Sequence, residues 1–162
     1  MVLKIQEVSC SKQLSISLGI DFVREQNKTL RMSKLTKIER FLLTEQHEPV
    51  SHYCHAVRCG EHIWISGMVG IDPEGRTPLK TFDQFGIAIK NLDSVLREAG
   101  GKPEHIVKVT VFLTNISDRS VINPIRQRYF GEHRPASTLV EVSKLVLPEL
   151  KVEIEAQAVV ID

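Results

Sequence analysis

Cysteine and histidine side chains gather around residues 52–62 and could, by their type, bind a metal ion. Cys54 and Cys59 flank a predicted hairpin strand, and His52, His55 and His62 lie near them in the sequence. Neither the Cys-x-x-Cys nor the His-x-x-x-His spacing of common metal sites occurs. We therefore interpret this group as hairpin residues on mixed faces of a strand and expect no metal.

The charge balance of the 162-residue chain argues against nucleic acids as general partners. The chain has 21 Lys and Arg residues and 20 Asp and Glu residues, which gives a net charge of +1. It therefore lacks the excess of basic residues that binds the phosphate backbone of a nucleic acid. No apolar run approaches the roughly 18 residues that span a bilayer. With three cysteines and no sign of export, we expect reduced thiols, a cytoplasmic location and neither a membrane nor a nucleic-acid partner.

The first elements that could position a site are extended. Short β-prone segments at 37–43, 53–57 and 63–66 predict a meander, and Asp72-Pro-Glu-Gly75 is a strong turn signal. Thr81-Phe-Asp-Gln84 has the capping-box pattern and predicts a helix from this point to Gly100-Gly101. The apolar stripe of that helix is expected to comprise Phe82, Phe85, Ile89, Leu92, Val95, Leu96 and Ala99.

The second half of the chain predicts a strand at 105–113, a helix at 118–131 and two further strands at 137–142 and 151–160. The helix should bury Val121, Ile122, Ile125 and Tyr129, and the last strand alternates cleanly between apolar and polar residues. The order of elements predicts an α+β fold with two helices on one face of a mixed sheet.

Composition divides the chain near Met32. Residues 1–31 show no sustained period and are interpreted as an N-terminal extension, or as upstream sequence before an alternative start at Met32. Residues 32–162 contain no Pro- and Gly-rich linker and are expected to form one domain.

Several motifs then occur in an order that resembles the RidA/YjgF family of reactive-intermediate deaminases, whose members are also named endoribonuclease L-PSP and translation initiation inhibitor. The motifs are Tyr53-Cys-His-Ala-Val, Ile65-Ser-Gly, Val109-Thr-Val-Phe, Tyr129-Phe-Gly-Glu-His, Arg134-Pro-Ala-Ser-Thr-Leu-Val-Glu-Val and Val152-Glu-Ile-Glu-Ala. Together they span roughly two-thirds of the chain.

The resemblance implies a chorismate-mutase-like homotrimer in which three sheets form a central barrel and ligands bind in clefts between subunits. It also implies cofactor-free hydrolysis of small enamines or imines to 2-keto acids and ammonia. An iminium carbon is already electrophilic, so such a site has mainly to hold a carboxylate, position a water molecule and transfer a proton. We expect a small ligand that carries a carboxylate or an imine.

One position departs from the pattern of the deaminating members. They hold the carboxylate with an arginine two residues after the proline of the Pro-Ala motif, and Ser137 stands there in this chain. Loss of a bidentate guanidinium should weaken binding of a small imino acid. Arg134, Arg126 and Arg128 are candidates to replace it, although Arg134, three residues away on an extended strand, should point to the opposite face.

The other positions matched by the resemblance form the expected site. Glu153 falls on the carboxylate near the water and is the expected catalytic residue, although it could simply lie on the polar face of a strand. Tyr53, Ser66, Gly67, Asn123 and Ser137 are the expected substrate-binding residues. Tyr53 could instead be a core residue, Gly67 a turn glycine and Asn123 a helix cap.

Three functions stay open at this point. The first is a deaminase or related hydrolase of the 2-iminobutanoate/2-iminopropanoate type with an altered substrate, for example an aminomuconate-like compound. The second is a non-catalytic trimer that binds metabolites or partner proteins. The third, a translation inhibitor or ribonuclease that acts on RNA, is disfavoured by the balanced charge.

Overall fold

The computed structural model describes residues 22–26, 37–46 and 48–161. The chain divides into two units, Met1–Lys37 and Ile38–Asp162. Of the first unit, residues 22–26 are helical. The boundary predicted between residues 31 and 32, and the alternative start at Met32, lie outside the described residues.

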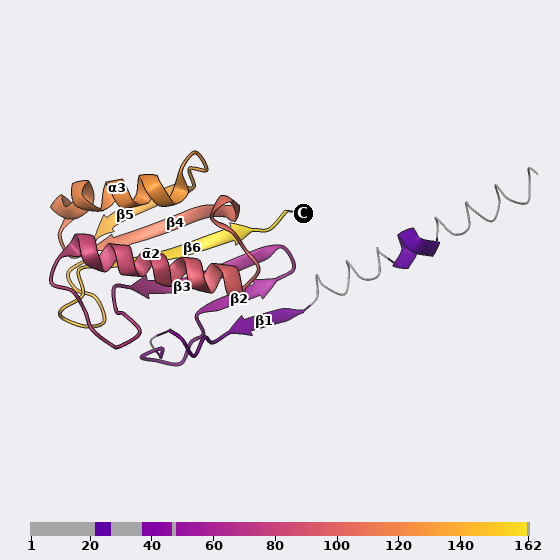
Figure 1. The fold of residues 1–162 in the computed structure, drawn as a ribbon, viewed down its shortest axis with the longest axis horizontal. Coiled ribbons are helices and arrows are strands. Elements are labelled where there is room, and N and C mark those ends of the chain that lie inside the picture. Colours follow the sequence, from indigo (N-terminus) through magenta and orange to yellow (C-terminus); the bar gives the residue numbers. More distant parts are fainter. Residues whose placement is uncertain (1–21, 27–36, 47, 162) are drawn as a thin grey trace, which may run out of the picture. The chain divides into compact units, whose positions relative to one another are not determined.

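The second unit is built on one six-stranded mixed sheet with the order β1-β2-β3-β6-β4-β5 (Figure 1). Neighbouring strands run antiparallel, except that β4 and β5 are parallel. The strands are β1 (Ile38–Phe41), β2 (Ala56–Cys59), β3 (His62–Val69), β4 (Ile106–Leu113), β5 (Ala136–Glu141) and β6 (Val152–Val159).

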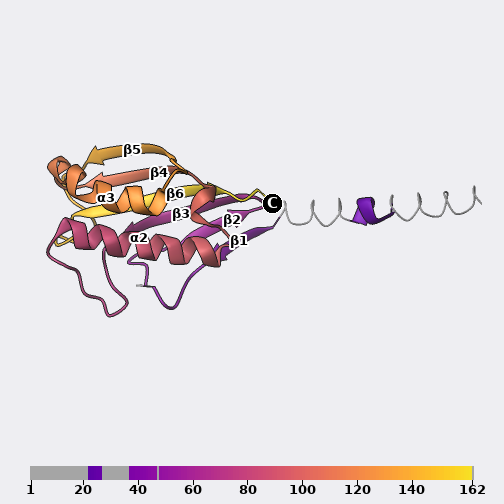
Figure 2. The same cartoon turned by 45° about the horizontal axis from the view of Figure 1, so that its top comes forward.

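Both long helices, α2 (Thr81–Glu98) and α3 (Arg119–Phe130), lie on the same face of the sheet, and the turned view keeps them there (Figures 1 and 2). Two short 3-10 turns, Pro103–His105 and Ile116–Asp118, precede β4 and α3. This is the α+β arrangement that the order of elements predicts. Within the described part of the chain, neither helix has the length and apolar character needed to cross a bilayer.

The two faces of the sheet differ in what they bury. In β6, Val152, Ile154, Ala156 and Ala158 are buried on the helix face, as the period of two predicts. Glu153, Glu155 and Gln157 point to the other side, which we call the open face: the sheet face opposite α2 and α3. Large apolar side chains also remain exposed there, namely Ile38, Trp64 and Val140.

The structure corrects the start of β2. The sequence predicts a strand from Tyr53, whereas regular pairing begins at Ala56. The preceding residues are held differently: the Ser66 hydroxyl donates to the Cys54 carbonyl at 2.7 Å, and the Ser66 N–H donates to the His55 carbonyl. Tyr53 consequently lies in the segment that leads into β2, before the first paired residue.

The capping-box interpretation of α2 is wrong. Lys80 is the N-cap residue and makes no side-chain capping bond, while the Thr81 hydroxyl donates to Asp118. The Gln84 side chain is fully buried and makes its hydrogen bonds to the backbone of other segments, and not to the start of α2. Phe82, expected in the apolar stripe, is 45% exposed, whereas the other expected residues are buried: Phe85, Ile89, Leu92, Val95, Leu96 and Ala99.

The buried face of α3 also differs from the prediction. Val121 is exposed, and Ile125 and Tyr129 are partly buried against the core. The two fully buried residues are Ile122 and Phe130. They are eight positions apart, so Arg126, four residues from each, lies on the same side of the helix. Pro124 lies inside α3, so the helix lacks the hydrogen bond that an N–H at this position would donate to the Ser120 carbonyl.

Candidate functional site

A cavity of about 470 Å³ opens between the loop that precedes β2 and the neighbouring ends of β3 and β6. It brings together four residues of the predicted site: Tyr53, Ser66, Gly67 and Glu153. The remaining lining comes from Val50, Ser51, Val69, Ile71, Val146 and Glu155. The wall is therefore mostly apolar, with two carboxyl groups and two hydroxyl-bearing serines, which is the composition of a small-molecule site.

A β-bulge places the Ser66-Gly67 pair. Ile65 pairs with Ala156 and Met68 pairs with Ile154, so β3 has one more residue than β6 across this step. An extra residue bends a strand and redirects its side chains. The bulge consequently lets Ser66 and Gly67 both line the cavity, although residues next to each other in a regular strand would face opposite sides.

The missing side chain at Gly67 makes room for the carboxyl group of Glu153. A Cβ atom added to Gly67 would overlap the Glu153 carboxylate and come close to the Cγ atom as well. The Glu153 side chain therefore lies directly against the Gly67 backbone. This contact explains the glycine better than a tight turn does, because the chain is extended there.

The cavity wall changes the acidity of Glu153. Partial burial raises the pKa of its carboxyl above the ordinary value, and the nearby charge of Glu155 adds to the effect. A carboxyl group with a raised pKa exchanges protons closer to neutral pH, as a general acid or base requires. Glu153 is thus the group in the cavity best suited to proton transfer.

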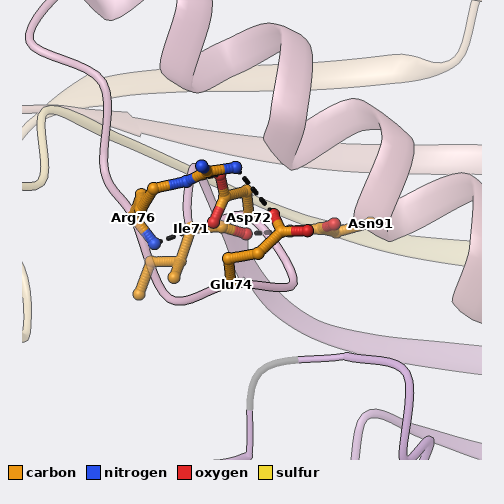
Figure 3. Close-up of polar contacts among 5 residues, drawn as sticks. All are labelled: Ile71, Asp72, Glu74, Arg76 and Asn91. Carbon is orange, nitrogen blue, oxygen red and sulfur yellow. Dashed lines mark hydrogen bonds and ion pairs between the residues drawn. The ribbon is translucent and has the colours of Figure 1, made fainter.

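A hydrogen-bonded turn after β3 fixes the apolar rim of the cavity. The Asn91 side chain, on α2, donates to the carbonyls of Val69 and Ile71 at 3.1 and 3.0 Å, and Figure 3 shows it reaching Ile71. In the same turn Asp72 accepts from the Arg76 backbone N–H at 2.8 Å and from its Nε at 2.7 Å (Figure 3). These bonds lower the pKa of the Asp72 carboxyl below its ordinary value.

The last two predicted site residues lie away from this cavity. Ser137 pairs with buried Val109 and therefore points to the helix face, whereas Glu153 pairs with Phe112 and points to the open face. Asn123 is an exposed residue of α3, on the helix side as well. One copy of the chain thus separates the predicted site into two groups on opposite faces of the sheet.

Arg126 is the functional candidate that the structure adds to the helix-side group. Its Nη2 donates to the Ser137 hydroxyl at 2.7 Å. Arg134 and Arg128, the other two candidates, are exposed, and in the described residues neither side chain makes a hydrogen bond. The four-residue spacing of Ile122, Arg126 and Phe130 was the sequence signal that could have favoured Arg126.

Sequence reasoning also missed parts of the cavity. Glu155 and Val146 were not predicted, and Val146 comes from the connection before β6, which carries no motif. Among residues 22–26, 37–46 and 48–161, no three His, Cys, Asp or Glu side chains are arranged to hold a metal ion.

Comparison with known proteins identifies relatives across nearly the whole second unit. The family model described as Endoribonuclease L-PSP matches residues 44–160. A RutC family protein of Pyrococcus abyssi is 36% identical over 113 residues, which are 68% of this chain and 88% of the relative. The mouse 2-iminobutanoate/2-iminopropanoate deaminase is 35% identical over 118 residues, 72% of this chain and 87% of that protein.

A solved structure shares the fold. The crystal structure of Escherichia coli TdcF with bound serine superposes with a TM-score of 0.70 at 29% identity. The match covers 75% of this chain and 98% of TdcF.

Proposed function

The chain belongs to the endoribonuclease L-PSP family, also known as RidA/YjgF, and from that membership we propose that it hydrolyses the imine or enamine form of a small amino-acid derivative. The observation that carries the proposal is the half-buried Glu153 carboxyl, held against Gly67 in a cavity that also presents Ser66 and Tyr53. A relative of 35% identity is named as a deaminase of this chemical type.

The proposed reaction needs only one proton-transfer group. Ionised Glu153 takes a proton from a water molecule, whose oxygen attacks the iminium carbon, and returns that proton to the nitrogen. The protonated tetrahedral intermediate then expels ammonia, and Glu153 transfers the remaining hydroxyl proton to that ammonia. The products are a 2-keto acid and one ammonium ion for each water consumed. The raised pKa of Glu153 suits both the acceptance and the return of the proton.

We further propose that the complete site lies between subunits of a homotrimer. The separation of Glu153 from Ser137 by the sheet supports this, because a single copy does not present both groups to one small ligand. The apolar side chains left exposed on the open face also favour assembly. A second copy would then bring the helix-side group of one subunit to the cavity of its neighbour.

The test is release of keto acid and ammonia from 2-iminopropanoate generated in the same vessel by a pyridoxal-dependent dehydratase. Glu153→Gln should lower kcat by roughly 100-fold or more, since general acid–base groups typically contribute about 10²–10⁴-fold. Glu132→Gln, at an exposed carboxyl beyond α3, is the matched control and should retain the wild-type rate.

Gly67→Ala provides a second variant that keeps the carboxyl group but displaces it. It should lose most of the activity while Glu153 is still present. Full activity of Glu153→Gln would exclude this carboxyl as the proton-transfer group. A folded wild-type chain that binds the keto acid but releases none would favour a binding protein without catalysis.

A further inference from the structure

Arg126 occupies a position on α3 where an apolar residue would be expected. Ile122 and Phe130, four residues before and after it, are buried against the sheet. Residues four apart share one face of a helix, so the Arg126 side chain starts from the inward face between these two. Its neighbours Gln127 and Arg128 are exposed, whereas Arg126 is half-buried.

Across the residues that the structure describes, no carboxylate accompanies this half-buried charge. In the described part of the chain, the ion pairs that arginines form involve Arg76 and Arg97, and no Asp or Glu oxygen lies within 4.0 Å of the Arg126 guanidinium. Burial alone lowers the pKa of Arg126, without a nearby charge to offset it. An arginine nevertheless stays protonated at neutral pH, so a positive charge is held here with one neutral acceptor.

Arg126 and Ser137 together keep hydrogen-bond donors that could bind an anion. The guanidinium has five N–H donors, and among the described residues only one acceptor, the Ser137 hydroxyl oxygen, is bonded to it. Because this oxygen accepts from Arg126, the hydroxyl hydrogen of Ser137 remains available to a ligand. Asn123, one helical turn before Arg126 and exposed, can add an amide donor.

We propose that Arg126, oriented by Ser137, binds the carboxylate of the ligand in this chain. The positive charge thus comes from the helix, while the strand contributes a small hydroxyl that holds the guanidinium and leaves room beside it. The proposal deepens the proposed function, on which it rests for the nature of the ligand, a short 2-keto or 2-imino acid.

A structural role for Arg126 would have a different signature. A half-buried charge without a carboxylate partner is costly to the fold, so a residue retained for stability would be apolar or ion-paired. Removal of the charge should therefore leave the melting temperature unchanged or raise it. Loss of ligand binding without loss of stability is what distinguishes recognition from packing.

The experiment measures binding of 2-oxobutanoate to the full chain by titration calorimetry. Arg126→Gln should weaken binding roughly 10- to 100-fold, the range for losing hydrogen bonds to a charged group. Arg128→Gln, which removes an exposed arginine two residues further on, should bind as the wild type does. The double variant Arg126→Gln with Ser137→Arg moves the charge to the strand and should recover most of the affinity.

The proposal would be overturned by wild-type affinity in Arg126→Gln, by equal weakening in Arg128→Gln, or by no binding of 2-oxobutanoate to the wild-type chain. A fall in melting temperature of Arg126→Gln that accompanies the loss of binding, without recovery in the double variant, would assign Arg126 to packing. Binding is measured without turnover, so an inactive chain that binds through Arg126 would contradict only the proposed deamination.

Discussion

At the scale of single residues, the candidate site depends on the neighbours of Glu153. Gly67 leaves space for its carboxyl group, and the charge of Glu155 contributes to its raised pKa. Burial is the larger cause of the raised pKa of Glu153, and the like charge of Glu155 is the smaller one. Both act on the ionised form of Glu153, which is the form that a general base needs. The acidity of one carboxyl therefore links the stability of the fold to its proposed reaction.

The pH dependence of stability should report this carboxyl. Its pKa is higher in the folded chain than in the unfolded chain, so the fold loses stability as pH rises through the interval between the two values. Below that interval Glu153 is protonated in both states. We expect Glu153→Gln to match the wild type in denaturant titrations at acid pH and to become the more stable protein as pH rises to neutral.

Glu155→Gln provides the comparison for that measurement. Removing the second charge should lower the pKa of Glu153 toward its ordinary value and reduce, without abolishing, the pH-dependent difference. A difference between Glu153→Gln and the wild type that stays constant with pH would show that Glu153 is not shifted.

At the scale of elements, Gln84 connects α2 to the segment that leads into β6. Its Nε2 donates to the carbonyls of Pro78 and Glu149 at 2.7 and 2.9 Å, and its Oε1 accepts from the Lys151 N–H at 2.8 Å. The Gln84 side chain is fully buried, so its amide depends on these three hydrogen bonds in place of bonds to water. The start of β6, and with it Glu153, is positioned partly by this amide.

Gln84→Leu should consequently destabilise the fold strongly, although the two side chains have nearly the same volume. Loss of the three hydrogen bonds that this buried amide makes to the backbone is expected to lower the free energy of unfolding by roughly 2–4 kcal/mol. Gln127→Leu, on the exposed side of α3, is the control and should change it by less than about 0.5 kcal/mol. Urea denaturation of both variants measures the difference, and similar values for the two would refute the connecting role.

The elements show which features a sequence can predict. Regular alternation in β6 and the long apolar period of α2 gave the right strand, helix and buried face, because these patterns follow from local geometry. The capping box failed, since Thr81 and Gln84 bind residues distant in the sequence, Asp118 and Glu149. Such tertiary bonds leave no local pattern.

In the candidate site, too, the sequence predicts what motifs carry and misses what depends on contacts between distant segments. Motif resemblance selected Tyr53, Ser66, Gly67 and Glu153, which the fold brings into one cavity. It did not reveal that Ser137 points to the other face, because this depends on the parallel register between β4 and β5. Arg126 could be named only as one of three arginines, since its contact with Ser137 joins a helix to a strand.

At the scale of the whole molecule, the sheet buries one face and leaves the other accessible. The helix face is covered by α2 and α3 (Figure 2). Trp64, on the inner strand β3, points to the open face and is 42% exposed. A tryptophan exposed on a broad sheet face is typical of a surface that another chain covers. The proposed trimer would bury it.

Light scattering on the purified chain should therefore give three times the monomer mass. Trp64→Lys should shift the population strongly toward monomer, because three ammonium groups would be buried in the trimer interior. Phe82→Lys is the matched control: its side chain is as exposed as Trp64 but lies on α2, outside the proposed interface, so the trimer should persist. A monomeric wild-type chain, or a trimer in Trp64→Lys, would contradict this assembly.

The contact between Gly67 and Glu153 has a consequence for how the two positions can change over evolutionary time. The space that the carboxyl occupies is the space that a side chain at position 67 would need. Neither position is then free to vary alone, and the pair should covary among related chains. Where an alanine replaces the glycine, we expect a shorter acid, such as aspartate, in place of the glutamate.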